Sequence, residues 1–240
     1  MTDPLFLTDS YLREAPGQVI GHTEEGGIVL DRSVFYATSG GQPGDAGRLT
    51  WDGGGIDIAT AVKGPEGAIV LVPAEPSRLP DLATRVTQSL VWDRRHRLMR
   101  MHTALHLLSV VIPLPVTGGQ IAIDKGRLDF DMEHAPADRE ALTARLNALI
   151  ASDLPVSSEW ITEAALDAQP ELVKTMSVRP PRGQGHIRLV RIGEGAGTVD
   201  LQPCGGTHVG WTSEIGHVRI GKIEKKGRQN RRVYLHLEDA

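Results

Sequence analysis

Cysteine, aromatic residues and long apolar runs are all scarce in this chain of 240 residues. A single cysteine, Cys204, rules out a disulfide within the chain, and a reducing compartment is its simplest setting. The N-terminus lacks a basic start followed by an apolar run, so we expect no secretory signal. The most apolar stretch, residues 104–116, is interrupted by His106 and Pro113 and is shorter than the ~20 residues that cross a bilayer. We therefore expect a cytoplasmic protein with no membrane partner.

A surplus of positive charge is also lacking, because the formal net charge is −4. The chain as a whole is no polycation, so any contact with nucleic acid must come from a local basic patch. Aromatic residues make up only 4% of the chain, and the core must therefore be built mainly from Leu, Ile, Val and Ala. The length suits one large domain or two modest ones.

Two regions of different character predict an α+β protein with two domains. Residues 1–90 contain short apolar runs, such as 27–30 and 67–72, bounded by Gly, Pro or Asp. This pattern predicts a small β-rich, barrel-like domain. The pattern changes near Asp93, and residues 91–240 are expected to form a second domain of helices and a mixed or antiparallel sheet.

The second region contains apolar residues at helical spacing. An apolar stripe predicts a helix that ends at Pro113; its members are Leu98, Met101, Leu105, Leu108 and Ile112. A second helix is expected after Pro136, with Leu142, Leu146 and Leu149 facing inward, and a third over residues 171–176. Alternating residues predict strands over 127–130, 186–192, 216–223 and 232–237.

The first candidate metal ligands are His102 and His106, which lie four residues apart on the expected helix. This spacing puts both imidazoles on one face, where they can share a metal ion. An isolated pair of this kind is more often two half-buried, hydrogen-bonded histidines. A metalloprotease of the His-Glu-x-x-His type is excluded, because its general-base Glu would occupy the position of Thr103.

The second pair consists of Cys204 and His208, again four residues apart. Gly205 and Gly206 between them allow a tight loop in which both side chains turn toward one point. A thiolate and three neutral imidazoles form a good tetrahedral set for Zn²⁺. Taken alone, this pair is more often a buried free cysteine beside a turn, so the zinc hypothesis depends on both pairs together.

The residues around both pairs resemble the zinc signature of the alanyl-tRNA synthetase editing domain. The similar stretches are RMHTALHLLS (100–109), DLQPCGGTHV (200–209), TSEIG (212–216) and KIEKKGRQNRR (222–232). In the N-terminal part, FYATSGGQP (35–43), with Asp45 and Gly47, resembles the glycine-rich motif of the same family. The chain is too short for a synthetase and shows no recognisable adenylate-forming region. It therefore resembles the free-standing alanyl-tRNA editing proteins of the AlaX type, in the longer form that keeps the glycine-rich domain.

The resemblance implies a metal-dependent aminoacyl-tRNA deacylase. Its substrate would be tRNA(Ala) that carries a wrong amino acid, chiefly serine, with glycine as a second candidate. A synthetase pocket shaped for alanine cannot exclude glycine and rejects an added hydroxyl only weakly, so a second, hydrolytic site is needed. The resemblance also implies the tRNA(Ala) acceptor end as partner, with no obligate protein partner evident, and one zinc ion per chain held by His102, His106, Cys204 and His208.

Zinc in such a site could activate water or polarise the ester carbonyl, or it could only orient the substrate. Thr38 is the candidate for sensing a serine hydroxyl, since its own hydroxyl both donates and accepts; otherwise it is a turn residue. Gly40, Gly41 and Gln42 are expected to form a loop that approaches the substrate closely, or else a plain hairpin turn. Two further candidates could orient a metal ligand from behind: Asp200 and Gln202.

A basic run near the C-terminus is the candidate tRNA contact. Residues 219–232 hold seven Lys and Arg side chains against one acid, Glu224. Such a run is usually a solvated face, but beside a tRNA-editing site phosphate contact is the better interpretation. The candidate RNA-binding residues are Arg100, Lys222, Lys225, Lys226, Arg228, Arg231 and Arg232. Two rival functions stay open: a zinc-stabilised RNA-binding module without catalysis, and a metal-dependent hydrolase of small esters or amides.

Overall fold

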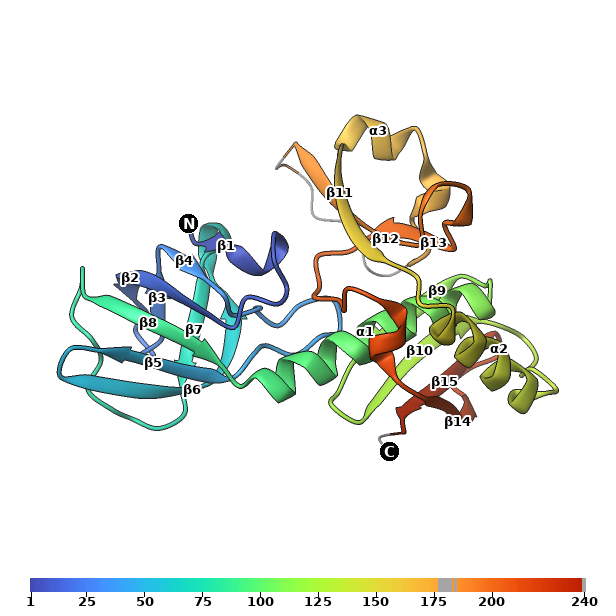
Figure 1. Cartoon of the computed structure of the whole chain (residues 1–240), viewed down its shortest axis with the longest axis horizontal. Coiled ribbons are helices and arrows are strands. Elements are labelled where there is room, and N and C mark those ends of the chain that lie inside the picture. Colours follow the sequence, from blue (N-terminus) through green and yellow to red (C-terminus); the bar gives the residue numbers. More distant parts are fainter. Residues whose placement is uncertain (177–182, 184, 239–240) are drawn as a thin grey trace. The chain divides into compact units, whose positions relative to one another are not determined.

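The structure is a computed structural model that describes residues 1–176, 183 and 185–238 (Figure 1). The chain divides into two compact units, Met1–Arg97 and the chain from Leu98 onward. No helix of the described chain combines the length and the apolar character that a membrane span needs.

The first unit is a closed antiparallel barrel of six strands, in the order β2-β3-β7-β6-β5-β8. Its strands are β2 (Glu14–His22), β3 (Ile28–Leu30), β5 (Gly47–Trp51), β6 (Gly54–Lys63), β7 (Ile69–Pro73) and β8 (Arg85–Leu90). Two short strands, β1 (Asp3–Pro4) and β4 (Arg32–Ser33), pair in parallel outside the barrel. The structure confirms the β-rich, barrel-like fold expected of this region.

Alternation of buried and exposed residues explains why these segments close on themselves. Leu49 on β5 and Ile56 and Ile58 on β6 are almost fully buried, while their neighbours in sequence face outward. The interior is filled by aliphatic side chains, as the scarcity of aromatic residues requires. Closure of the barrel pairs every strand edge, so this small unit presents no open sheet edge from the barrel itself.

A buried ion pair fixes the first turns of the long helix α1 (Trp92–Val111) within the first unit. The Arg95 guanidinium donates from Nε to both carboxylate oxygens of Asp45, at 3.0 and 2.9 Å, and both side chains are almost fully buried. Arg95 also donates to the carbonyls of Ser10 and Val34, at 3.0 and 2.6 Å. Asp45 belongs to the glycine-rich stretch, so this pair connects that stretch to the helix.

Helix α1 continues into the second unit as predicted, and Pro113 follows its end. The predicted stripe is buried, and Gly126 on β10 lies so close to α1 that an added Cβ would meet the Met101 sulfur at 2.6 Å. The sheet beneath the helix has four antiparallel strands in the order β14-β15-β10-β9. They are β9 (Val116–Gln120), β10 (Lys125–Asp131), β14 (Val218–Lys225) and β15 (Asn230–Leu237).

A second antiparallel sheet holds β11 (Val156–Thr162), β12 (His186–Ile192) and β13 (Asp200–Pro203), in that order. The predicted strand over 186–192 therefore lies in a different sheet from β14 and β15. Together with three α-helices in the described chain, these sheets confirm the α+β class. Helix α2 (Arg139–Ala151) is capped by Asp138, whose carboxylate accepts from the Ala141 N–H at 2.8 Å. Leu146 is fully buried there.

The prediction of a third helix over residues 171–176 is wrong. Residues 171–176 form the end of a 3-10 turn, Pro170–Leu172, followed by an extended segment. The reason is a long-range pairing: the Val116 N–H donates to the Lys174 carbonyl and the Met176 N–H donates to the Val116 carbonyl. The helix in this region is instead the short α3 (Glu163–Asp167), capped by the Thr162 hydroxyl.

Candidate metal centre

Helix α1 presents two imidazoles and a hydroxyl toward the candidate metal centre. His102, Thr103 and His106 are all buried, with 8%, 0% and 7% of their surface exposed. The rings of His102 and His106 lie with centroids 5.2 Å apart on one side of the helix, as the four-residue spacing predicts. Helix packing thus brings two potential ligands into the protein interior.

A loop at the end of β13 supplies the other two potential ligands. The Cys204 N–H donates to the Arg188 carbonyl at 3.1 Å, which continues the β12–β13 pairing to the cysteine itself. The buried Arg188 guanidinium donates from Nη1 to the carbonyls of Cys204 and Gly206, both at 3.0 Å. Arg188 therefore fixes the backbone of the loop on which Cys204 and His208 lie.

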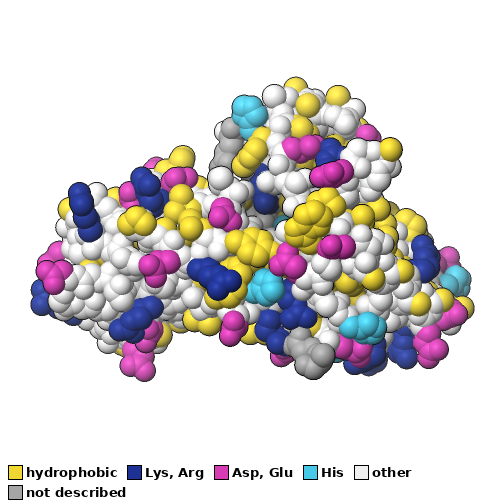
Figure 2. All heavy atoms as spheres, viewed as in Figure 1, with side chains coloured by type: hydrophobic (Ala, Val, Ile, Leu, Met, Phe, Trp, Pro, Cys, Tyr) yellow, Lys and Arg dark blue, Asp and Glu magenta, His cyan; other side chains and the backbone are white. Residues whose placement is uncertain are grey.

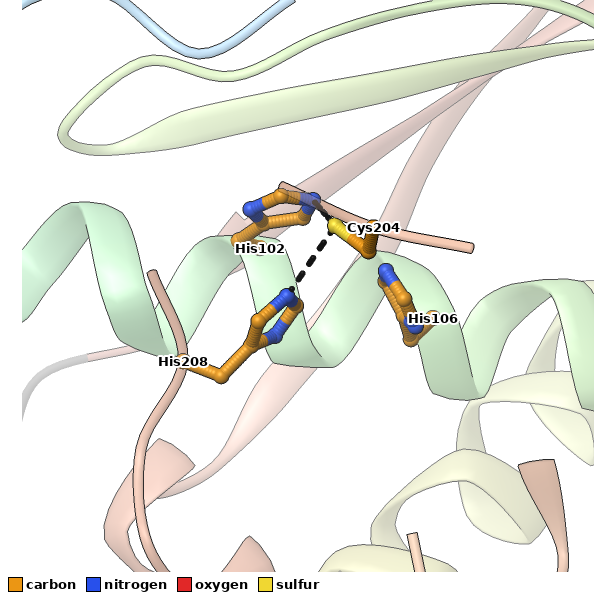
Figure 3. Close-up of side chains that lie close together, drawn as sticks. All are labelled: His102, His106, Cys204 and His208. Carbon is orange, nitrogen blue, oxygen red and sulfur yellow. Dashed lines mark hydrogen bonds between the residues drawn. The ribbon is translucent and has the colours of Figure 1, made fainter. Parts of the chain in front are cut away.

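The four side chains converge on one point (Figure 3). The possible ligand atoms of His102, His106, Cys204 and His208 all lie within 4.8 Å of one another. Cys204 Sγ is 3.5 Å from Nε2 of His102 and 3.3 Å from Nε2 of His208. In a tetrahedral zinc site, with Zn–S near 2.3 Å and Zn–N near 2.0 Å, the S···N separation is roughly 3.5 Å. The cluster could therefore bind a metal ion, and its two S···N separations are close to those of a tetrahedral site.

The charges within the cluster favour the metal-binding form of the cysteine. Burial alone would raise the pKa of the Cys204 thiol, but the neighbouring His102 and His208 hold it well below the usual value. Burial, together with the charge of His102, lowers the pKa of His208 to about 3. The thiolate and the neutral His208 suit a metal ion. Although burial would lower it, the pKa of His106 rises to about 9 because of its hydrogen bond to Asp200, so metal binding would release a proton from that imidazole.

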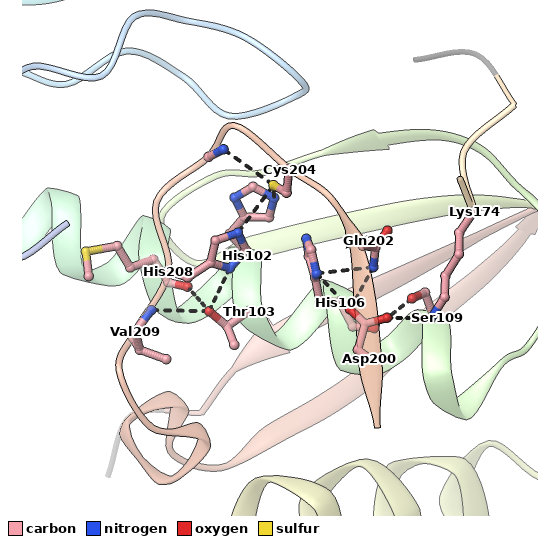
Figure 4. Close-up of polar contacts among 12 residues, drawn as sticks. His102, Thr103, His106, Ser109, Lys174, Asp200, Gln202, Cys204, His208 and Val209 are labelled. Atoms are coloured by element: carbon pink, nitrogen blue, oxygen red, sulfur yellow. Dashed lines mark hydrogen bonds and ion pairs between the residues drawn. The ribbon is translucent and has the colours of Figure 1, made fainter. Parts of the chain in front are cut away.

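His106 is oriented from behind by a buried polar network (Figure 4). Its Nδ1 lies 2.9 Å from an oxygen of Asp200, and Gln202 Nε2 donates to the same oxygen at 2.8 Å. Lys174 Nζ contacts the other oxygen of Asp200 at 2.5 Å. Although burial would raise it, the pKa of Asp200 falls to about 2 because of His106 and then Lys174. An ionised carboxylate there keeps the proton on Nδ1 and directs Nε2 of His106 toward the other ligands.

His208 is oriented in a different way, by the hydroxyl of Thr103. Thr103 Oγ1 donates to the Met99 carbonyl at 2.9 Å and lies 3.1 Å from His208 Nδ1. Because the hydroxyl proton is used within the helix, Oγ1 accepts from the Nδ1–H of His208. It also accepts from the Val209 N–H, at 3.3 Å. The lone pair of His208 Nε2 is thereby left to point at Cys204 Sγ.

Three residues of this centre were not anticipated from the sequence: Thr103, Lys174 and Arg188. Thr103 follows His102 directly, but its role depends on a histidine 105 residues away. Lys174 and Arg188 likewise act through long-range contacts. Asp200 and Gln202, proposed from the sequence as groups behind the ligands, are found in contact with His106.

The glycine-rich candidates lie together in the first unit, whereas the four potential ligands belong to the second. Ser39 and Gln42 exchange backbone hydrogen bonds of 3.0 and 2.8 Å around Gly40 and Gly41, both with positive φ. This is a tight two-residue turn, and it buries the Gln42 side chain completely. Thr38 is exposed as a residue, and its part-buried hydroxyl donates to the Ala61 carbonyl at 3.2 Å and accepts from the Gly44 N–H at 2.8 Å.

The basic candidates differ in how far other groups engage them. Arg232 makes ion pairs with Asp129 at 2.8 and 2.9 Å, and the buried Arg231 donates to the carbonyls of Glu133, Gly227 and Asn230. These two arginines therefore stabilise the β14–β15 hairpin and its surroundings. Arg100 Nε donates to the Ile215 carbonyl at 2.9 Å, in the same unit.

The lysines of the hairpin are exposed, and two of them share one acidic partner. Lys222 and Lys226 each contact a different oxygen of Glu224, at 2.8 Å. Lys225 and Arg228 are exposed, and neither has an ion-pair partner in the described chain. Basic and acidic side chains are interspersed on the face in Figure 2, as the net charge of −4 suggests. The hairpin tip at Lys225 and Arg228 is thus the part of the basic run that is available to an anion.

Two families of tRNA synthetase domains match the chain. The threonyl and alanyl tRNA synthetase second additional domain matches residues 187–234, and the class II (A) tRNA synthetases match residues 12–94. The first match contains the Cys204 and His208 loop, and the second contains the barrel and the glycine-rich turn. The two matches therefore relate the barrel and the α+β unit to domains of tRNA synthetases.

Relatives that match over their whole length identify the family within this class. The chain is 34% identical to an alanyl-tRNA editing protein AlaX-M of Methanosarcina acetivorans and 32% identical to one of Saccharolobus solfataricus, over at least 99% of each chain. It is also 33% identical to an alanine–tRNA ligase of Pyrobaculum arsenaticum, over 93% of this chain but 25% of the ligase. The chain belongs to the AlaX family of alanyl-tRNA editing proteins.

Proposed function

We propose that the protein hydrolyses the ester bond between tRNA(Ala) and a wrong amino acid, chiefly serine and secondarily glycine, with one zinc ion as cofactor. The observation that carries the proposal is the buried His₃Cys cluster, whose ligand atoms lie within 4.8 Å of one another, in a chain of the AlaX family. A serine-charged tRNA(Ala) is the expected error, because an alanine pocket rejects one added hydroxyl weakly. In this proposal residues 91–240 form the editing domain and residues 1–90 the glycine-motif domain.

The donor set favours zinc over harder cations. One thiolate and three imidazoles suit Zn²⁺, whereas Mg²⁺ and Ca²⁺ prefer oxygen ligands. A bound zinc ion would supply a Lewis acid that polarises the ester carbonyl or favours ionisation of water. The protein's own contribution is to hold the ligands: Asp200, supported by Lys174 and Gln202, orients His106, and Thr103 orients His208.

We propose that the Thr38 hydroxyl recognises a serine substrate by accepting a hydrogen bond from the serine hydroxyl. Its hydroxyl proton is directed at the Ala61 carbonyl, and one oxygen lone pair accepts from the Gly44 N–H. The remaining lone pair can accept the proton of a serine hydroxyl, which alanine and glycine lack. Gly40 and Gly41 leave the backbone of the turn free of side chains, and buried Gln42 supports the turn from inside.

The acceptor end of tRNA(Ala) is proposed to contact the basic hairpin. Lys225 and Arg228 are the main candidates for phosphate contact, with Lys222 and Lys226 sharing their charge with Glu224. Arg100, Arg231 and Arg232 contribute indirectly, since their hydrogen bonds hold the backbone and the hairpin in place. Contacts of this kind weaken as the salt concentration rises.

The test is a deacylation panel of Ser-, Gly- and Ala-tRNA(Ala), with metal-loaded and chelator-treated protein. We expect rapid loss of serine, slower loss of glycine, little loss of alanine, and recovery of activity when zinc is restored. Binding of tRNA(Ala) without turnover of any ester would instead establish a zinc-stabilised RNA-binding module. Four protein ligands on one ion would favour this alternative, because structural zinc sites are closed in this way. Equal hydrolysis of small serine esters would establish a general esterase.

A further inference from the structure

A single row of side chains crosses the three-stranded sheet from its edge to the metal centre. Trp160 on β11 lies directly opposite Arg188 on β12. The β12–β13 register pairs Leu189 with Pro203, so the next position pairs Arg188 with Cys204, whose N–H donates to the Arg188 carbonyl. Directly opposed residues of antiparallel strands point to the same side of the sheet. Trp160, Arg188 and Cys204 therefore share one face.

Exposure changes steeply along this row. Arg188 is 9% exposed and fixes the Cys204 loop, whereas Trp160 is 52% exposed on β11, the edge strand of the sheet (Figure 1). The exposed indole offers a large flat apolar surface on the same face of the sheet as the candidate metal centre. The row thus runs from a candidate metal ligand through a buried cation to an open aromatic surface.

The charge of this face suits a polyanion. Its only described acid is Asp200, which is buried and contacts Lys174 and His106. The exposed acid of the sheet, Glu159, alternates with Trp160 along β11 and therefore points to the opposite face, where it pairs with Arg191 at 3.0 Å. A nucleic acid strand on the Trp160 face would meet no exposed carboxylate among the described residues of that face.

We propose that Trp160 is a stacking surface for an unpaired nucleobase at the 3′ end of the tRNA. The proposal rests on the function proposed above. Adjacent strands are ~4.8 Å apart, so β11 lies about 10 Å from β13 and Cys204. A terminal nucleotide whose ester lies at the metal centre could span that distance. Either its own base or the neighbouring base would then extend outward to Trp160. Indole rings bind single-stranded bases with little regard to sequence.

The experiment compares two uncharged acceptor-stem RNAs, one with its single-stranded 3′ end and one without, by fluorescence anisotropy with the zinc-loaded full chain. Trp160→Ala should weaken binding of the intact RNA ~5- to ~150-fold, which corresponds to about 1–3 kcal/mol for one stacked base. Trp160→Phe should retain most of the affinity. The matched control is Trp211→Ala, which removes an indole of similar exposure, 50%, outside the row.

Loss of affinity in Trp160→Ala should be the same at low and high salt and should vanish for the RNA without its 3′ end. Unchanged binding of the intact RNA, in a variant with a normal unfolding midpoint, would overturn the proposal even if the protein hydrolyses Ser-tRNA(Ala). An effect as large in Trp211→Ala would also overturn it. Wild-type protein that shows the Trp160-dependent binding but hydrolyses no ester would contradict the proposed function and leave the stacking surface standing.

Discussion

Replacement of Thr103 by Val tests how the protein holds His208. Valine keeps the shape of the side chain but removes Oγ1, which lies 3.1 Å from His208 Nδ1 and 3.3 Å from the Val209 N. The site is fully buried, so no water replaces the lost acceptor. In the metal-free protein the His208 ring can turn toward another partner, whereas metal coordination fixes it. The substitution should therefore raise mainly the free energy of the metal-bound state.

The magnitude follows from the contacts. An unsatisfied buried donor costs about 1–3 kcal/mol, and the contact with the imidazole N–H is the shorter of the two. A loss of this size lowers the zinc affinity roughly 5- to 150-fold. Loss of groups that orient metal ligands commonly weakens metal binding by about 10- to 100-fold, which agrees with this range.

The assay is a competition titration of zinc between the protein and a chromophoric chelator. The control is Thr103→Ser, which keeps an oxygen at the same position and should bind zinc within about threefold of wild type. The reasoning would be refuted if Thr103→Val bound zinc as tightly as wild type, or if Thr103→Ser lost as much affinity as Thr103→Val.

Three further predictions concern charged residues away from the ligands. Asp45→Asn leaves a buried arginine without its counter-charge, so urea denaturation should show a loss of about 3–5 kcal/mol, and a loss below ~1 kcal/mol would contradict the account. Burial would raise the pKa of Asp129, but Arg232 and Arg127 lower it overall. The ionised carboxylate of Asp129 therefore stabilises the folded protein above pH ~4, and this contribution disappears as the pH falls through the lowered pKa. The melting temperature of wild type should then fall more steeply below pH 4 than that of Asp129→Asn, and parallel curves would argue against this pair. Lys225→Ala with Arg228→Ala should reduce the salt dependence of tRNA binding by about two phosphate contacts, whereas Arg232→Ala should chiefly lower the melting temperature; the reverse pattern would refute the assignment.

Local sequence patterns predicted the parts of the site that depend on short-range geometry. The spacing of His102 and His106 determines that they share a helix face, and the apolar stripe determines which side of that helix is buried. The loop after Cys204 does bring the thiol to those imidazoles, but neither Gly205 nor Gly206 adopts the positive φ for which glycine was expected there. The barrel followed from short apolar runs separated by turn residues, because these patterns are set by neighbours in sequence.

Long-range contacts explain what the sequence could not provide. A helix was expected over residues 171–176, yet pairing of that segment with Val116 holds it extended and places Lys174 against Asp200. Arg232 belongs to a basic run that indicated phosphate contact, but the fold places Asp129 beside it. In each case the deciding partner is far away along the chain, where no local pattern reveals it.

The most direct test of the central claim is a cobalt titration of the metal-free protein, since Co²⁺ reports its own ligands spectroscopically. With His102, His106, Cys204 and His208 around one ion, one equivalent of Co²⁺ should give intense tetrahedral visible bands and a thiolate charge-transfer band in the near ultraviolet. Cys204→Ser should lose the charge-transfer band, and excess zinc should bleach both. A spectrum without thiolate character in wild type, or one unchanged in Cys204→Ser, would contradict a single metal centre shared by the helix and the glycine loop.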